Sequence, residues 1–344
     1  MQRCIQLALL GAGMVAPNPM VGAVLVYNDR IIGEGYHRQY GAAHAEVNCI
    51  ASVAATDRAL IAAATLYVSL EPCAHFGKTP PCSDLIIANE IKKVVIGCKD
   101  PFTAVNGKGI EKLRNAGVDI VVGVLEDACL QVNKAFFTFH TRHRPYIIIK
   151  WAQTADAKVA AEDTRQRLII SNDLTNRLVH RWRSEAAAIL VGTNTALMDD
   201  PVLNNRLWTG QPPLRMVLDL SLRLPNSLKL FNNKYKTIVF NNIRQETVGE
   251  TTYVQLNRNP PLISQISDAC YTLNIQSILV EGGPTLIQAF FDAGLWDEAR
   301  VITNETLLAN HGLPAPTVNR HYKNKTEQYQ SDKVDYYTNK PINQ

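Results

Sequence analysis

The stretches HAEVNCI (residues 44–50) and EPCAHFGKTPPCSD (residues 71–84) decide the fold of the first part of the chain, because they join metal-binding side chains to helix starts. His44, Cys73 and Cys82 supply one nitrogen and two sulfur donors. A catalytic zinc takes three protein ligands and keeps a fourth position for water. Glu46 lies two residues after the histidine and can transfer a proton without binding the metal. We therefore predict a zinc site held by His44, Cys73 and Cys82, with Glu46 as the catalytic residue.

The sequence around these stretches alternates between strand and helix patterns. The run VGAVLVYNDRIIGEGYH (residues 21–37) predicts a hairpin that turns at Asn28–Asp29. A helix is expected from residue 82, with Cys82 or Ser83 near its cap and Asp84 in its first turn. Further strands are expected in 64–73, 92–101 and 118–123, and further helices in 44–55, in 108–117 (closed by Gly117) and towards residue 129. This alternation predicts a three-layer α/β domain over residues 1–144.

The cysteine pattern leaves two other interpretations open. One is a pair of buried free cysteines beside a surface histidine and glutamate, and the other is a purely structural zinc, against which Glu46 argues. Seven cysteines in a long chain do not indicate a disulfide framework and fit a reducing compartment. The remaining ones are expected to be small core residues: Cys4, Cys49, Cys98, Cys129 and Cys270.

Length and charge limit the function further. A chain of 344 residues exceeds the usual size of one hydrophobic core, which favours two domains. The net charge of +4 is spread without a basic run, so we expect no nucleic-acid partner. No apolar run approaches the roughly 20 residues of a membrane-spanning helix. Residues 1–19 have a mildly signal-like composition, but we interpret them as an amphipathic helix and expect a cytoplasmic protein.

A second α/β domain is expected in residues 145–344. A basic connector that starts at Thr141 leads into an apolar run, and strand and helix patterns alternate from there to about residue 302. The stretch VEGGPTL (residues 280–286) predicts a strand, a glycine turn and a helix start that suits a phosphate. The stretch GTNTALMDDP (residues 192–201) is expected to form a loop for a cofactor phosphate or ribose. Residues 326–338 form either an edge hairpin or a disordered tail.

The motifs of the first domain resemble a known family. PNPMVGAVLV, HAEVNCI, EPCAHFGKTPPC and KDP…NGKG look like the deaminase half of the bifunctional riboflavin-biosynthesis deaminase/reductases. The zinc signature H-x-E…P-C-x-x-C of cytidine-deaminase-like proteins is present with one departure, since eight residues separate Cys73 from Cys82. The resemblance implies a cytidine-deaminase-like domain whose substrate pocket contains Asn18, His75, Lys78 and Asp100.

Residues 145 to about 305 resemble the reductase half of the same family, which has a dihydrofolate-reductase-like fold. The resemblance implies that five residues bind the substrate: Lys150, Arg183, Asp199, Arg206 and Glu281. A guanidinium fork binds phosphate bidentately, so Arg183 and Arg206 would hold the substrate phosphate, while Asp199 and Glu281 would hold its pyrimidine and sugar. NADPH would contact Ala152, Thr195, Gly283, Pro284, Thr285, Leu286, Ile287, Gln288 and Ala289.

The resemblance implies two consecutive steps of riboflavin biosynthesis. The first is zinc-dependent hydrolytic deamination of 2,5-diamino-6-(phosphoribosylamino)pyrimidin-4-one, and the second is NADPH-dependent reduction of the ribosyl side chain to ribityl. The expected partners are this small molecule and further copies of the chain, with no membrane. Where the family has Asp-Gly-Lys or Asp-Gly-Arg, this chain has Asp156-Ala157-Lys158, which at a positive φ would cost about 1 kcal/mol. Alternatives are a chain with deaminase activity alone, a nucleic-acid deaminase, and a zinc-stabilised binding module.

Overall fold

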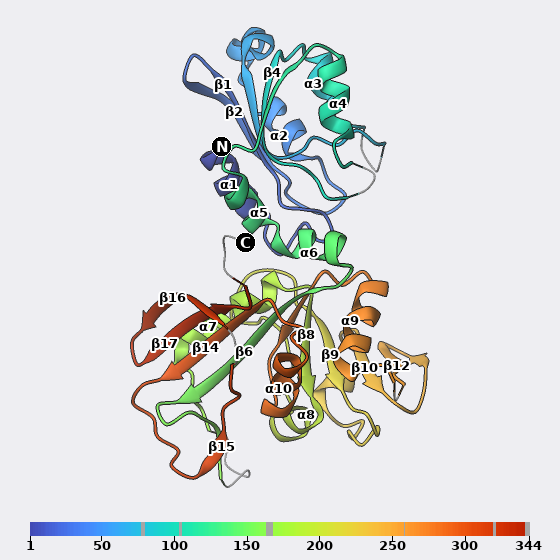
Figure 1. The fold of residues 1–344 in the computed structure, drawn as a ribbon, viewed down its shortest axis with the longest axis vertical. Coiled ribbons are helices and arrows are strands. Elements are labelled where there is room, and N and C mark those ends of the chain that lie inside the picture. Colours follow the sequence, from blue (N-terminus) through green and yellow to red (C-terminus); the bar gives the residue numbers. More distant parts are fainter. Residues whose placement is uncertain (77–79, 103–104, 163–167, 258, 319–320, 341–344) are drawn as a thin grey trace. The chain divides into compact units, whose positions relative to one another are not determined.

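The computed structural model describes residues 1–76, 80–102, 105–162, 168–257, 259–318 and 321–340, and the chain divides into two units (Figure 1). Unit 1 is Met1–His143 and unit 2 is Arg144–Gln344. Each unit has a hydrophobic core of its own, built on its own sheet. In the described part of the chain, no helix is both long and apolar enough to cross a membrane.

Unit 1 is built on a five-stranded sheet in the order β2-β1-β3-β4-β5. Strands β1 (Gly22–Tyr27) and β2 (Arg30–Tyr36) form the predicted antiparallel hairpin. Asn28 and Asp29 form its two-residue turn with φ of 47° and 59°, the left-handed region that such turns require. Strands β3 (Thr65–Leu70), β4 (Lys93–Cys98) and β5 (Asp119–Val122) run parallel to one another. Their carboxyl ends therefore lie at one edge of the sheet.

Helices cover both faces of this sheet and give the predicted three layers. The first face carries α2 (Ala45–Ala51), the 3-10 helix η1 (Ala55–Ala63), α3 (Cys82–Ala88) and α4 (Lys108–Asn115), which pack on Ala23, Leu25 and Leu66. The second face carries α1 (Gln2–Leu9) and α5 (Glu126–Val132), which pack on Val24, Leu70 and Cys98. Helix α6 (Lys134–Arg142) follows α5. Neighbouring residues of β1 thus serve opposite cores, as the alternation of a strand requires.

Three local predictions for unit 1 can be compared with the structure. The first residues form the amphipathic helix α1, which buries Cys4 and Leu7. Gly117, with φ of 81°, closes α4 as predicted. Cys82 and Ser83 lie near the cap of α3 as predicted, with Asp84 in its first turn: Pro81 is the N-cap, Cys82 is the first helical residue, and no side chain caps the helix.

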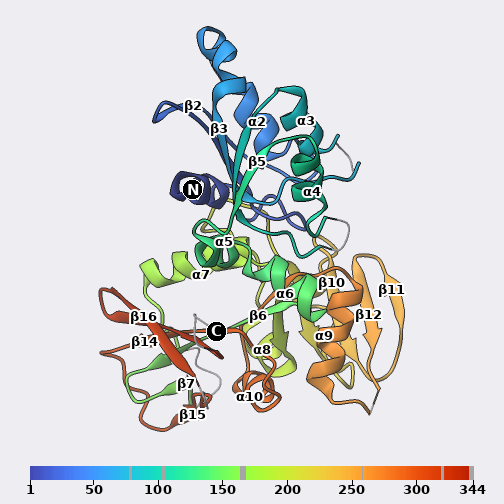
Figure 2. The same cartoon turned by 45° about the horizontal axis from the view of Figure 1, so that its top comes forward.

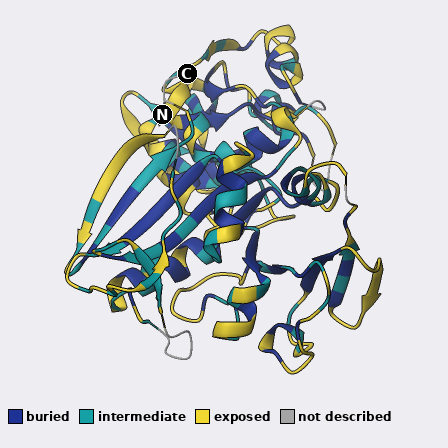
Figure 3. Cartoon of the chain, turned by 60° about the horizontal axis from the view of Figure 1, so that its bottom comes forward, coloured by how far each residue is buried: buried dark blue, intermediate teal, exposed yellow. Residues whose placement is uncertain are grey.

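Unit 2 is built on a ten-stranded sheet in the order β11-β12-β10-β9-β8-β13-β6-β14-β17-β16. The strands from β12 to β14 in this order run parallel, and their middle members are dark blue, or buried, in Figure 3. Their bounds are β6 (Tyr146–Thr154), β8 (Ala188–Gly192), β9 (Leu214–Leu218), β10 (Thr237–Asn241), β12 (Thr251–Gln255), β13 (Ser277–Val280) and β14 (Glu298–Asn304). Parallel strands end at a common edge, so loops far apart in sequence meet there.

The outer strands of unit 2 are antiparallel. Strand β11 (Glu246–Val248) pairs with β12 at one side, where Figure 2 shows both beside β10. At the other side, β16 (Tyr322–Tyr329) and β17 (Asp332–Thr338) form a hairpin that adds to β14. The tail is therefore the predicted edge hairpin. A separate two-stranded sheet joins β7 (Lys158–Ala161) to β15 (Gly312–Pro314).

The helices of unit 2 lie on both faces of the sheet. Helices α9 (Leu262–Thr272) and α10 (Pro284–Asp292) pack on one core with Ile147, Leu190 and Ile278. The short helix α8 (Thr193–Asp199) and the 3-10 helix η2 (Lys229–Phe231) pack on the opposite core with Ile189, Val191 and Val217. Helix α7 (Asp173–Glu185) begins at Asn172, whose side chain accepts hydrogen bonds from the backbone N–H groups of Leu174 and Thr175.

Two predicted boundaries in this region are wrong. Thr141 and Arg142 belong to the end of α6, so the connector is shorter than predicted. Residues 193–199 form helix α8, although a loop was predicted there, because Ala196 is buried in the core while Asn194, Leu197 and Met198 remain exposed. The helix is only two turns long, which is too short for its periodicity to be distinct in the sequence.

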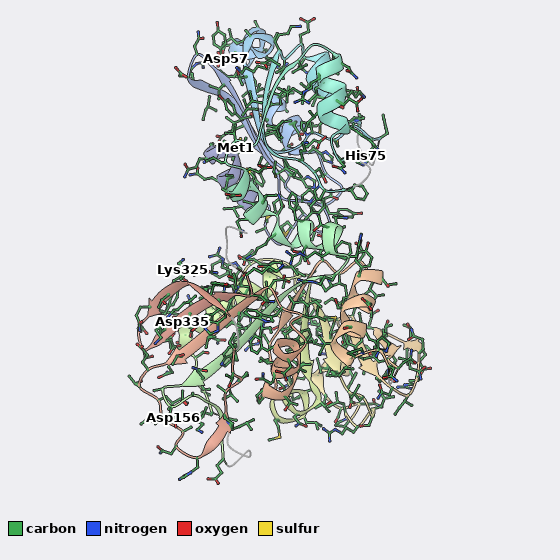
Figure 4. The ribbon with its side chains drawn as sticks, viewed as in Figure 1. Met1, Asp57, His75, Asp156, Lys325 and Asp335 are labelled. Carbon is green, nitrogen blue, oxygen red and sulfur yellow. The ribbon has the colours of Figure 1, made fainter. Side chains whose placement is uncertain are left out.

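Ala157, which stands where the family has glycine, adopts the left-handed backbone conformation. Its φ is 55°, and its backbone bonds to Thr154 and Ala315 hold it there. Figure 4 labels the neighbouring Asp156 in the turn that follows β6. Glycine adopts this φ without strain, whereas alanine does not.

We expect Ala157→Gly to raise the free energy of unfolding of unit 2 by up to about 1 kcal/mol. Urea unfolding of the full chain, followed by the fluorescence of the unit 2 tryptophans, measures the change. Ala155→Gly in the same turn is the matched control, because Ala155 has no positive φ, and it should lower stability. Equal effects of the two substitutions would show that the φ of Ala157 stores no strain.

Candidate functional site

Three side chains from separate segments of unit 1 converge on one point. His44 is the N-cap of α2, Cys73 follows β3, and Cys82 is the first residue of α3. Nδ1 of His44 lies 3.6 Å from Sγ of Cys73 and 3.3 Å from Sγ of Cys82. All three donor atoms lie within 4.8 Å of one another. The structure thus brings together the ligands that the sequence predicted, and Nδ1 is the histidine nitrogen that faces the centre.

The thiol groups of the two cysteines have different pKa values, and only that of Cys73 is lowered. The thiol of Cys82 and the imidazole of His44 hydrogen-bond to Cys73 and lower the pKa of Cys73 to about 4. The backbone N–H of Cys82 also donates to this sulfur, at 3.3 Å. The pKa of Cys82 is raised, because its own thiol proton is held by Cys73. One nitrogen and two closely spaced sulfurs match the donor set and the three-ligand count of a catalytic zinc, so these residues fit the metal.

Glu46 lies in the first turn of α2 and is only 3% exposed. Burial raises the pKa of Glu46 to about 7, and the negative charge of Cys73 adds to this effect. A carboxyl group with a pKa near neutrality can both accept and donate a proton at physiological pH. Its position one helical turn or less from a zinc ligand therefore gives it the properties of a proton carrier.

Of the residues implied to bind the substrate in unit 1, Asn18 and Asp100 have defined contacts. Nδ2 of Asn18 lies 3.2 Å from Nε2 of His37. Asp100 is buried, and its Oδ1 accepts a hydrogen bond from the backbone N–H of Phe102 at 2.7 Å. Burial raises the pKa of Asp100 to about 7. His75 is exposed (Figure 4), and Lys78 lies outside the described residues.

His37 is a site residue that sequence reasoning missed. It is 3% exposed, its ring meets that of His44 edge-on at 5.4 Å, and its Nδ1 lies 3.0 Å from the carbonyl oxygen of Ala43. A carbonyl only accepts, so Nδ1 carries the hydrogen, and the neutral ring accepts from Asn18 through Nε2. Burial lowers the pKa of His37, which agrees with the neutral form. A single histidine after a strand is a common pattern, so the sequence did not indicate that His37 belongs near the zinc ligands.

Glu71 is a second residue that was missed. Its buried carboxylate accepts hydrogen bonds from the backbone N–H groups of Asp100, Gly107, Gly109 and Ile110, at 3.0–3.3 Å. A side chain at Gly109 would place its Cβ 1.9 Å from the carbonyl oxygen of Pro72, so only glycine allows this approach. Glu71 thereby ties the segment that carries Asp100 to the segment that carries Cys73. Its place directly before Pro-Cys was the available signal.

Unit 2 contains a cavity of about 1220 Å³ at the carboxyl ends of its parallel strands. Thirteen of the residues that the resemblance implies for substrate or NADPH binding line this cavity, although they are up to about 140 positions apart in the sequence. The cavity is lined by Lys150, Ala152, Arg183, Thr195, Asp199, Arg206, Glu281, Gly283, Pro284, Thr285, Leu286, Ile287 and Ala289. Gln288 is not among the lining residues, and its side chain instead bonds to Asp292 and to the backbone of Thr317.

The contacts of Arg183 differ from the predicted ones. Its Nε and Nη2 donate to the two carboxylate oxygens of Glu281, both at 2.7 Å, and its Nη1 donates to the carbonyl oxygen of Asn204 at 3.0 Å. The guanidinium fork thus faces Glu281 and is not open to a phosphate in this structure. The side chains of Arg183 and Glu281 are only 14% and 5% exposed, so removal of either one would leave the other as an unpaired buried charge. Burial alone would raise the pKa of Glu281, but the charge and hydrogen bonds of Arg183, together with the charges of Lys150 and His180, lower this pKa.

The cavity holds further positive charge near this pair. Lys150 extends from β6, and burial lowers its pKa, although the charge of Glu281 works against the shift. Arg206 is exposed and lines the cavity. Together with the carboxylates of Asp199 and Glu281, these cations form a polar end of the cavity that suits a phosphorylated sugar.

Family models match both units. Residues 1–98 match the model of the cytidine and deoxycytidylate deaminase zinc-binding region, and residues 145–329 match that of the RibD C-terminal domain. The first match contains His44, Cys73 and Cys82, and the second contains the cavity.

Several proteins are similar to this chain over most of its length. The riboflavin biosynthesis protein RibD of Aquifex aeolicus is 41% identical over 302 residues, which span 86% of this chain and 83% of the relative. The protein of the same name from Escherichia coli K12 is 33% identical over 330 residues, 90% and 88% of the two chains. A diaminohydroxyphosphoribosylaminopyrimidine deaminase/5-amino-6-(5-phosphoribosylamino)uracil reductase from Thermotoga maritima superimposes with a TM-score of 0.89 at 34% identity, covering 98% and 97%.

Proposed function

This chain belongs to the RibD family of riboflavin-biosynthesis proteins, and we infer that it catalyses two consecutive steps on one small molecule. It deaminates 2,5-diamino-6-(phosphoribosylamino)pyrimidin-4-one and then reduces the ribosyl side chain of the product to ribityl. The single observation that carries this inference is the presence of both sites in one chain: the His44–Cys73–Cys82 cluster beside a buried glutamate, and the polar-ended cavity of unit 2.

In the deaminase site, we propose that Glu46 moves the protons. His44, Cys73 and Cys82 would hold the zinc, which would supply Lewis acidity for the attack of water on the ring carbon. Glu46, with its pKa of about 7, takes a proton from that water and returns it to the departing amine. Its burial excludes bulk water from this exchange. No other described carboxyl group lies in the helix turn that carries the first metal ligand.

We further propose that Asn18, His37 and Asp100 orient the pyrimidine. The hydrogen bond from Nδ2 of Asn18 to Nε2 of His37 fixes the orientation of the Asn18 amide. Oδ1 of Asn18 then remains as an acceptor for a ring N–H or an amino group of the substrate. Asp100 is held by Phe102 and by the Glu71 network. His75 and Lys78 stay proposals that rest on the resemblance alone.

In the reductase site, the residues of unit 2 bind and position the reactants. NADPH supplies the hydride. We propose that Arg206 and Lys150 hold the phosphorylated sugar, while Arg183 positions Glu281 and the Asn204 backbone at the same end. All five proposed substrate residues line the cavity, which supports an active reductase over a chain with deaminase activity alone.

We expect Arg206→Ala to raise the KM for the deaminated substrate roughly ten- to a hundred-fold, because a charge-assisted hydrogen bond contributes about 1.5–3 kcal/mol. Steady-state reduction of the deaminated substrate measures this value. The KM for NADPH and the rate of ammonia release should stay almost unchanged. A large rise in the KM for NADPH with an unchanged substrate KM would instead assign Arg206 to the cofactor.

The order of the two steps gives the test of the function. Ammonia should be released without NADPH, and NADPH should be oxidised only once deaminated product is present. NADPH oxidation before any ammonia release would refute the order.

We also propose that the protein is a cytoplasmic homo-oligomer without nucleic-acid or membrane partners. Light scattering coupled to size-exclusion chromatography measures the number of chains in the oligomer.

A further inference from the structure

Strand β17 begins with a buried carboxylate that is part of neither site described above. Asp332 is the first residue of this strand and has an exposed fraction of 0%. It follows the turn 330–331, which joins β16 to β17, and lies beyond residue 329, where the match to the RibD C-terminal domain ends. Burial of a carboxylate is costly unless hydrogen-bond donors surround it. The donors around Asp332 therefore indicate what this residue does.

The donors come mainly from the start of helix α7. Oδ2 of Asp332 accepts a hydrogen bond from the backbone N–H of Asn172 at 2.8 Å and another from the hydroxyl group of Thr175. Asn172 is the N-cap of α7, and its Nδ2 donates to the carbonyl oxygen of Tyr329 at 2.7 Å. Oδ1 of Asp332 accepts from the hydroxyl group of Ser331 at 3.2 Å. Hydrogen bonds thus join the turn of the C-terminal hairpin directly to the first turn of α7.

The other end of α7 rests on the same part of the sheet. The guanidinium carbon of Arg300, on β14, lies 4.8 Å from the centroid of the Trp182 ring. Tyr336, on β17, meets the Trp182 ring edge-on at 6.1 Å. Thr175 and Trp182 are seven positions apart, so they lie on one face of the helix. One face of α7 is therefore held by β14 and β17 near both of its ends.

Another face of α7 lines the cavity of unit 2. Asn176, Val179 and Arg183 are three and four positions apart, and all three line this cavity. Arg183 donates two hydrogen bonds to Glu281, a proposed substrate residue. The segment 168–171, which leads into α7, lines the same cavity. A shift of α7 would therefore displace the substrate end of the cavity.

We propose that Asp332 is a positioning residue of the reductase, which holds the start of α7 and thereby keeps Arg183 and Glu281 in place for the deaminated substrate. This inference rests on the proposed reductase function. Without the carboxylate, the N–H of Asn172 and the hydroxyl of Thr175 would lose their acceptor at a buried place, and the first turn of α7 would shift. Helix α7 is one continuous element of 13 residues, so the shift would reach Arg183.

Calorimetry with the deaminated substrate, in the absence of NADPH, tests the proposal without turnover. We expect Asp332→Ala to bind this substrate roughly five- to thirty-fold more weakly than the wild type. Asp332→Asn should bind it almost as tightly as the wild type, because one amide oxygen can accept both bonds of Oδ2 while the amide nitrogen donates to Ser331. Since asparagine is neutral, this recovery would exclude a direct effect of the Asp332 charge on the substrate. Binding by Asp332→Asn as weak as that by Asp332→Ala would overturn the proposal.

Asp335→Ala is the matched control. Asp335 (Figure 4) is a buried carboxylate on the same strand, and its bonds to Thr326 and Lys323 stay within the hairpin. The control should lower the thermal stability, as Asp332→Ala does, and keep the affinity for the deaminated substrate. Equal losses of affinity in the two variants would assign Asp332 to general support of the hairpin and overturn the proposal.

A second pair of variants tests the same bond from the helix side. Thr175→Val removes one of the two donors to Asp332 with little change in volume, whereas Thr175→Ser keeps the hydroxyl group. We expect weaker substrate binding from the valine variant alone. If Asp332→Ala failed to fold, as circular dichroism would show, this pair would decide the proposal, and equal affinities of the two variants would overturn it.

Steady-state reduction gives the second measurement. In Asp332→Ala the KM for the deaminated substrate should rise by a similar factor, the KM for NADPH should rise less, and ammonia release should not change, since that site lies in unit 1. An equal rise of both KM values would mean that the variant loosens the whole cavity, against the proposal. If the wild type bound the substrate but reduced nothing with NADPH, the proposed function would fail, and the calorimetry would still decide the role of Asp332. Absence of binding by the wild type would refute both.

Discussion

Glu46→Gln should bind zinc as the wild type does and release ammonia roughly a hundred- to ten-thousand-fold more slowly, the range that positioned acid–base groups contribute. The amide has the size of the carboxyl group but cannot carry a proton between water and amine. Because His44, Cys73 and Cys82 are untouched, the metal stays in place. Ammonia release and metal content, measured on the same preparation, give both results.

Two controls make this result specific. Asp84→Asn changes an exposed acid in the first turn of α3, the helix that begins with a zinc ligand, and should deaminate at nearly the wild-type rate. Reduction of pre-deaminated substrate by Glu46→Gln should also persist, since that site lies in unit 2. Near-normal ammonia release by Glu46→Gln would remove Glu46 from the mechanism.

Cys82→Ser should lose most of the zinc that the wild type binds at about one ion per chain. The variant lacks a thiolate ligand, and it also loses the thiol that holds the pKa of Cys73 low, so the second sulfur becomes a poorer donor. Elemental analysis after dialysis measures the loss, and deamination should disappear with it.

Cys270→Ala is the matched control for the loss of a cysteine, because Cys270 is buried in the core of unit 2 and is not part of the cluster. It should keep its zinc. Full zinc retention by Cys82→Ser would mean that another residue supplies the third ligand. Such a result would also contradict the interpretation of the eight-residue interval between the cysteines.

The zinc cluster could be predicted because its chemistry restricts the residue types. Few combinations of side chains serve a catalytic zinc, and His44, Glu46, Cys73 and Cys82 each stand beside a strand end or a helix start that the pattern also predicts. The sheets could be predicted for a similar reason, since buried parallel strands are nearly continuous apolar runs. The two-residue turn at Asn28–Asp29 has its own local signature.

Other features depend on tertiary contacts that leave no local pattern. His37 is ordinary in the sequence, and its role comes from Asn18, nineteen positions away. The Arg183–Glu281 pair joins residues 98 positions apart, so its preference over a phosphate contact could not be predicted. Helix α8 is stabilised by burial of Ala196 rather than by its own amphipathic pattern. The positive φ of Ala157 was deducible only from the family's glycine.

Mass spectrometry of the pyrimidine after incubation with the purified, zinc-loaded chain tests the central claim most directly. Without NADPH, the product should have exchanged one amino group for oxygen and kept its ribosyl chain. With NADPH, the same product should also have gained two hydrogen atoms in the sugar chain. Recovery of unchanged substrate under both conditions, or hydrogen gain on a pyrimidine that still carries its amino group, would contradict a chain that deaminates first and reduces second.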